Sequence, residues 1–91
     1  MTENEIVREI KEALETLNLP TWVSLKEIRE RYRALSKKYH PDVSKDGEKM
    51  REINKAYTVL KNYIENYRFT FSRDEILKQF PQEQHASKFK F

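Results

Sequence analysis

Three consecutive residues, His40, Pro41 and Asp42, bring together an imidazole that can change charge near neutral pH, a rigid ring and a carboxylate. Proline lacks a backbone N–H and disfavours α geometry in the residue before it, so a helix that arrives here must end at about Tyr39. His40 and Asp42 are therefore expected on a turn. There both side chains can reach a partner.

A histidine beside a carboxylate could also bind a metal or take part in catalysis. His40 and Asp42 supply only two ligands from one turn, and the other histidine, His85, lies far along the chain, so a four-ligand zinc site is not complete. There is no cysteine, and the single glycine, Gly47, cannot build a phosphate-binding loop. We expect no metal, no cofactor and no catalytic residue. A purely structural alternative is that His40 caps the helix and Pro41 stops it.

The residues before this turn predict a basic amphipathic helix over 24–39. Ser24 and Glu27 have the spacing of a capping box, which satisfies free N–H groups at a helix start. An apolar stripe occupies an arc of about 80° on this helix, and it consists of Leu25, Ile28, Tyr32, Leu35 and Tyr39. Beside it lies a basic stripe of Lys26, Arg29, Arg33 and Lys37, while Arg31 and Lys38 flank the other side.

The positive charge of the chain is concentrated on this helix. The net charge is +3, and residues 24–39 hold six basic and two acidic residues, a net +4 that leaves −1 for the remainder. A localised basic face indicates a specific acidic partner surface rather than a generally adhesive protein. Periodicity alone favours a merely solvated helix face, which basic residues on surface helices usually form.

Further helices are predicted on both sides of the basic helix. One covers residues 3–18, and another covers 48–67 with an apolar stripe of Met50, Ile53, Tyr57, Leu60, Ile64 and Tyr67. Ser72 and Glu75 form a second capping-box pattern that starts a short helix before Pro81. Trp22 is expected to cover the core, and Phe69 and Phe71 to hold the short helix against the others. A chain of 91 residues supports one small domain.

The segment EIRERYRALSKKYHPD (27–42) resembles the core of the J-domain family, typified by DnaJ, in which His-Pro-Asp separates two antiparallel helices. MREINKAYTVL (50–60) is similar to the family's following helix, so the resemblance covers roughly residues 24–64. It implies an all-α J-domain: an antiparallel helical hairpin with an N-terminal helix and a short C-terminal helix. We expect residues 1–81 to form this domain and 82–91 to be a mobile tail.

The resemblance also implies a function. J-domain co-chaperones bind a DnaK-type heat-shock chaperone and stimulate its ATP hydrolysis, which promotes client capture and folding. By resemblance, Arg29 and Arg33 would meet an acidic patch on the ATPase domain, and Asp42 would engage an arginine near the interdomain linker. The expected partner-binding residues are His40, Pro41, Asp42, Arg29, Arg33, Lys26, Lys37 and Lys38. The chain would then activate an ATPase without being an enzyme itself.

Three positions depart from the family pattern and bear on partner choice. Ala34 stands where many members have a basic residue, Val43 where arginine or lysine is common, and Met50 at a frequently aromatic position. A fourth helix of the usual basic type does not follow residue 60. Client proteins are unknown from the sequence. Client delivery would use the N-terminal helix, the segment from Phe69 onward, or another protein.

Two other functions remain open at this point. A small basic nucleic-acid-binding module is disfavoured because Glu27 and Glu30 interrupt the basic helix, and its binding would survive loss of the Asp42 charge. A structural hairpin that dimerises through Trp22 or the aromatic tail would show a concentration-dependent mass. The acidic N-terminus lacks a signal peptide and no apolar run could span a membrane. We therefore expect a cytoplasmic monomer.

Overall fold

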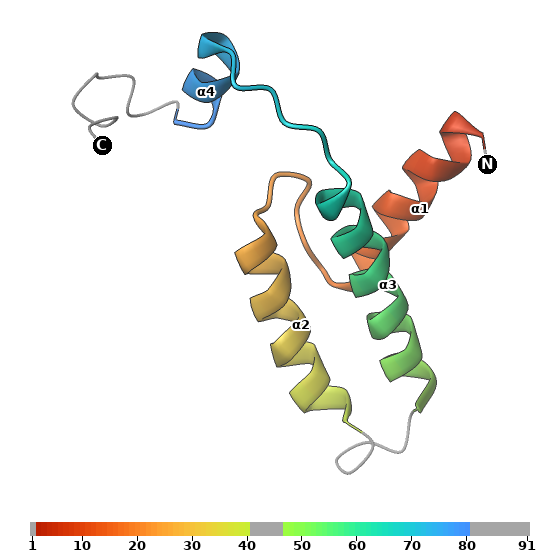
Figure 1. Cartoon of the computed structure of the whole chain (residues 1–91). Coiled ribbons are helices and arrows are strands. Elements are labelled where there is room, and N and C mark those ends of the chain that lie inside the picture. The colour runs from red at the N-terminus through yellow and green to blue at the C-terminus, as the bar shows by residue number, and fades with distance from the viewer. Residues whose placement is uncertain (1, 41–46, 81–91) are drawn as a thin grey trace.

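The computed structural model describes residues 2–40 and 47–80, and within these ranges all regular structure is helical. The four helices are α1 (Glu3–Thr16), α2 (Leu25–Tyr39), α3 (Gly47–Glu65) and α4 (Arg73–Lys78). They follow the order in Figure 1, with α2 and α3 side by side in opposite directions and α1 crossing α3. The expected all-α class and helical hairpin are confirmed.

Local hydrogen bonds define where the helices begin. At the start of α2 the backbone N–H of Glu27 donates to Ser24 Oγ at 3.2 Å, and the N–H of Ser24 donates to Glu27 Oε1 at 3.2 Å. This is the capping box that the sequence predicts. Ser72 caps α4 by accepting from the N–H of Glu75 at 3.3 Å. The capping patterns in the sequence therefore predict correctly where the basic helix and the short helix begin.

The end of α1 depends on a residue that sequence reasoning passed over. Asn18 has a φ of 54°, the left-handed conformation that asparagine tolerates better than most residues. The N–H of Leu19 donates to the carbonyl of Leu14 at 2.8 Å, and the N–H of Asn18 to that of Glu15 at 3.0 Å. These two bonds make a Schellman C-cap. The helix therefore ends at Thr16, two residues before the predicted end at residue 18.

The core is built on α3, which packs against α1 and against α2. The buried side chains of the core come from all three helices and from the residue after α1. They are Ala13, Leu17, Ile28, Ile53, Ala56 and Leu60. Ala13 and Ala56 are small, which lets helices approach closely. The predicted apolar stripes of α2 and α3 face this core, because most of their remaining members are half-buried against it. No buried charged residue occurs among the described residues.

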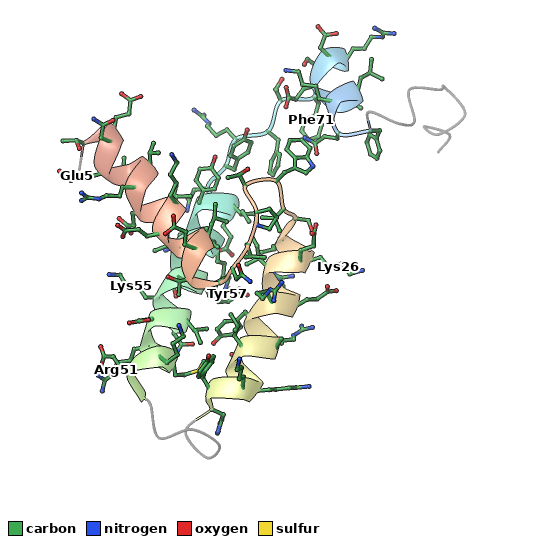
Figure 2. All side chains as sticks on the ribbon, turned by 180° about the vertical axis from the view of Figure 1, so that it is seen from behind. Glu5, Lys26, Arg51, Lys55, Tyr57 and Phe71 are labelled. Atoms are coloured by element: carbon green, nitrogen blue, oxygen red, sulfur yellow. The ribbon has the colours of Figure 1, made fainter. Side chains whose placement is uncertain are left out.

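A tyrosine pair fixes how α2 lies along α3. The rings of Tyr32 and Tyr57 stack with centroids 4.2 Å apart and planes inclined by 13°. The hydroxyl of Tyr32 donates to Asn54 Oδ1 at 2.6 Å. Figure 2 shows Tyr57 on the side of α3 that faces α2, while Arg51 and Lys55 point away from the hairpin. Stacking and a directional hydrogen bond together specify one register.

The aromatic residues outside the hairpin do not behave as the sequence predicted. Trp22 is 73% exposed and does not cover the core, whereas Leu17, at the end of α1, is fully buried in it. Phe69 and Phe71 are 68% and 83% exposed. They do not hold α4 in place, since α4 contacts none of α1, α2 and α3. Helix α3 also ends at Glu65, two residues before Tyr67.

The predicted domain limit at residue 81 stays a prediction. The tail over 82–91 lies outside the described residues. Within the described ranges, no helix is long and apolar enough to cross a membrane.

The core predicts the cost of a cavity in α3. Ile53 is fully buried, so Ile53→Ala should lower the free energy of unfolding by about 2–5 kcal/mol. Ile6→Ala is the matched control, because Ile6 is 45% exposed and should cost much less. Urea unfolding followed by circular dichroism measures both. Equal losses in the two variants would mean that α3 is not the centre of the core.

Candidate partner-binding surface

The basic residues of α2 lie on a face that points away from α3. The apolar stripe packs Ile28 into the core, and the period of 3.6 residues then places the neighbouring stripe in solvent. Figure 2 shows Lys26 directed outward from α2. The exposed residues of this basic face are Lys26, Arg29, Arg33 and Lys37. The structure therefore brings together the four residues that the sequence placed on one stripe.

The residues of the basic face form no ion pair with the described residues. The side-chain ion pairs found in the described ranges are Arg8–Glu12 on α1, Arg51–Glu48 on α3 and Lys78–Glu75 on α4. Glu27, the acidic residue of the first turn of α2, is held by the capping box, with its Oε1 accepting from Ser24 Oγ at 2.9 Å. Like charges spaced four residues apart on a helix cost a few tenths of a kcal/mol each. This surface is thus maintained at some cost to helix stability.

The C-terminal end of α2 has the geometry that Pro41 requires. His40 is the exposed C-cap residue, and its φ of −58° and ψ of 141° are extended rather than helical. α2 ends at Tyr39, as predicted. Pro41 and Asp42 lie outside the described residues, as does Val43. His40 therefore marks the point where the basic face meets the predicted docking turn.

A second contact joins the two helix ends on either side of this turn. The ammonium group of Lys49, from the first turns of α3, lies 5.6 Å from the ring centroid of Tyr39. Lys38 Nζ lies 5.4 Å from the same centroid. Cation–π contacts at exposed sites contribute about 0.5–1 kcal/mol each. The Lys49 contact holds the end of α2 beside the start of α3, whereas Lys38 and Tyr39 are neighbours within α2. Both ammonium groups add to the positive charge at this end of the molecule.

Sequence reasoning did not identify Lys49 or Asn54, although both support the site. Asn54 directs the Tyr32 hydroxyl, and Lys49 covers the Tyr39 ring. A usable signal existed for Asn54, because it follows Ile53 on the face of α3 that borders the apolar stripe. Lys38 differs from the four residues of the basic face, since it belongs to the flank that contacts Tyr39. Ala34 is exposed, and this position of α2 therefore adds no charge to the helix surface.

The described residues contain no group of three or more histidine, cysteine, aspartate or glutamate side chains that could hold a metal ion. The exposed chemistry of α2 is therefore cationic hydrogen-bond donation by guanidinium and ammonium groups. Arginine can form paired, charge-assisted bonds with a carboxylate, whereas lysine acts as a point charge. Such a surface suits an acidic protein partner.

The solvated basic face predicts that charge removal there leaves folding intact. Arg29→Gln and Arg33→Gln should each change the free energy of unfolding by less than about 0.5 kcal/mol, because neither side chain has an ion-pair partner among the described residues. Chemical denaturation at two salt concentrations measures this. A loss above 1 kcal/mol, of the order of a lost cap or hydrogen bond, would indicate a structural role instead.

Comparisons with known proteins bear on this surface. The family model described as the DnaJ domain matches residues 12–68. A DnaJ-like protein of Mycoplasma genitalium is 53% identical over 45 residues, which is 48% of this chain and 14% of that protein. The chaperone protein DnaJ of Bacillus cereus is 51% identical over 49 residues, covering 50% of this chain and 13% of that protein. No solved structure matches this chain.

Proposed function

Because the chain belongs to the DnaJ domain family, with residues 12–68 matched, we propose that it is a co-chaperone that binds a DnaK-type heat-shock chaperone and stimulates its ATP hydrolysis. In this role the chain activates a partner enzyme and performs no reaction of its own. The stimulated partner would capture and fold client proteins. We place this activity in the cytoplasm and assign it to the monomer.

The observation that carries the proposal is the basic face of α2, which has no neutralising partner among the described residues and leads directly to His40. Positive charge concentrated on one helix face steers an acidic surface toward it and favours one orientation on docking. The helix end then presents His40 and the following Pro41-Asp42 to the same partner. One docking event thereby brings both elements into contact.

Each residue has a specific role in this proposal. Arg29 and Arg33 bind an acidic patch on the ATPase domain, with Lys26, Lys37 and Lys38 extending the field around them. Asp42 accepts paired hydrogen bonds from an arginine near the interdomain linker. His40 and Pro41 set the direction in which the chain continues after α2, and so they orient the Asp42 carboxylate toward the partner. Exposed pairs contribute only about 0.2–1 kcal/mol each, so the complex is transient and weakens as salt rises.

Single-turnover ATP hydrolysis by a purified DnaK-type chaperone tests the proposal. The wild-type chain should accelerate hydrolysis, and Asp42→Asn and His40→Gln should each abolish the acceleration. Both substitutions keep side-chain size, so the domain should stay folded by circular dichroism. Retained stimulation in either variant, or no stimulation by the wild type with several chaperone paralogues, would contradict the mechanism.

Arg33→Gln and Arg31→Gln make a matched pair for the docking step. Both remove one positive charge from an exposed position of α2, but Arg31 lies on the flank opposite the basic face. Arg33→Gln should raise the concentration of co-chaperone that gives half-maximal stimulation by about three- to tenfold, since a charge-assisted contact is lost. Arg31→Gln should change it much less. Equal effects would mean that only net charge matters, and not the face.

A further inference from the structure

The chain between α3 and α4 is an extended segment whose backbone groups find no partner among the described residues. After α3 the N–H of Tyr67 donates to the carbonyl of Ile64 at 3.2 Å. The next backbone bond in the chain is accepted by the Ser72 carbonyl, which starts α4. From Arg68 to Phe71 no backbone hydrogen bond to another described residue is formed. Figure 1 shows this segment leading away from the three packed helices toward α4. We call residues 67–72 the extended strip.

Side chains along the extended strip alternate in the manner of a β-strand. Tyr67, Phe69 and Phe71 occupy every second position, and the residues between them are Arg68, Thr70 and Ser72. Aromatic residues and threonine favour strands. The three aromatic side chains are 49%, 68% and 83% exposed. The segment therefore has the pattern and propensity of a strand without a neighbouring strand.

The aromatic rings form a continuous apolar path. Tyr63 at the end of α3 meets Tyr67 edge to face at 5.7 Å, and Tyr67 meets Phe69 in the same way at 5.2 Å. A hollow of about 450 Å³ lies beside this path, lined among others by Phe69, Phe71 and Ile76. Contiguous exposed apolar surface on a small protein marks a contact site more often than chance. Figure 2 places Phe71 next to α4, at the far end of the path.

Complementarity identifies the kind of partner. An unpaired extended segment binds a second extended chain by strand addition, in which main-chain hydrogen bonds supply affinity and alternate side chains supply specificity. The partner must bring free N–H and C=O groups and an apolar side chain at every second position. A folded domain has these groups occupied, whereas an unfolded polypeptide offers them. The single charged side chain of the strip is Arg68, so two paired copies of the strip would bring like charges together.

We propose that the extended strip, with its aromatic path and the hollow beside α4, binds an extended apolar segment of an unfolded polypeptide by strand addition. The inference rests on the proposed co-chaperone function and names the region that holds the client. The strip lies at the opposite end of the hairpin from His40 (Figure 1), so client and chaperone can be bound at once. The basic face of α2 takes no part in client binding.

Fluorescence anisotropy with a labelled peptide tests this directly, using the full chain. The probe has nine residues that alternate leucine and threonine between terminal glutamates. A second probe has the same sequence with N-methyl groups on the alternate amides that would donate to the strip. The wild-type chain should bind the first probe saturably and the second at least about tenfold more weakly. Equal binding of the two probes would overturn strand addition.

Matched variants separate the strip from general apolar attraction. Phe69→Ser/Phe71→Ser removes two exposed rings and should weaken probe binding at least about tenfold while the helical content is unchanged. Ile6→Ser/Val7→Ser removes two residues that are 45% and 48% exposed on α1, and it should change binding less than about twofold. These residues line a different hollow, of about 420 Å³, between α1 and α3. Loss of binding in the α1 variant would place the peptide there and overturn the proposal.

Two further measurements exclude other occupants and separate this inference from the chaperone activity. A doubling of mass in light scattering that disappears in Phe69→Ser/Phe71→Ser would make a second copy the occupant and overturn the proposal. Absence of saturable probe binding to the wild type would also overturn it. Asp42→Asn should bind the probe as the wild type does, because the strip includes no residue of the segment that follows His40. Failure of peptide binding with intact ATPase stimulation would therefore reject the strip alone.

Discussion

The packing of α2 against α3 along one apolar stripe is the constraint on which the remaining features depend. The Tyr32–Tyr57 stack and the bond from Tyr32 to Asn54 select a single register for the two helices. Rotation of α2 by one residue would turn the basic face by about 100° and bring charged groups against α3. The exposure of Arg29 and Arg33 is therefore a consequence of core packing. No local feature of these arginines determines it.

The same packing determines what happens at the two ends of the hairpin. At one end, Tyr39 and Lys49 hold α2 and α3 together on either side of the turn that begins at His40. At the other end, the core is already closed by Leu17 and Leu60, which are 0% and 3% exposed. An apolar hollow of about 420 Å³ remains beside Leu60, but its lining includes neither Phe69 nor Phe71. The chain therefore leaves the three-helix body after Tyr67, with its aromatic side chains still in solvent.

Much of the fold could be predicted from the sequence because its signals are local. The capping box at Ser24, the stop before Pro41 and the stripe through Ile28 and Ile53 each follow from spacing and hydrogen-bond requirements. The C-cap at Asn18 was missed because an asparagine at φ 54° has no strong sequence signal beside a nearby proline. The residues of the docking surface could be proposed from the sequence, but the contact between Lys49 and Tyr39 could not. That contact depends on how the two helix ends approach.

The exposed aromatic residues show where local reasoning is insufficient. Trp22, Phe69 and Phe71 are residue types that usually occur in a core, yet they are the most exposed large hydrophobic side chains of the described residues. Whether an aromatic residue is buried depends on whether the core has space left, and that is a property of the whole packing. Such residues are then available for intermolecular contacts.

A molecule with separate surfaces at its two ends can couple two partners without any conformational change. α4 packs against none of the three helices, although Gln79, which follows it, lines a hollow together with Trp22 and Glu27. A client held at one end is nonetheless kept within a few nanometres of a chaperone bound at the other. Tethering of this kind raises the effective concentration of one partner for the other to about millimolar. In the two proposals taken together, client delivery is a consequence of proximity, and ATPase stimulation depends on the basic face of α2 and on the docking turn.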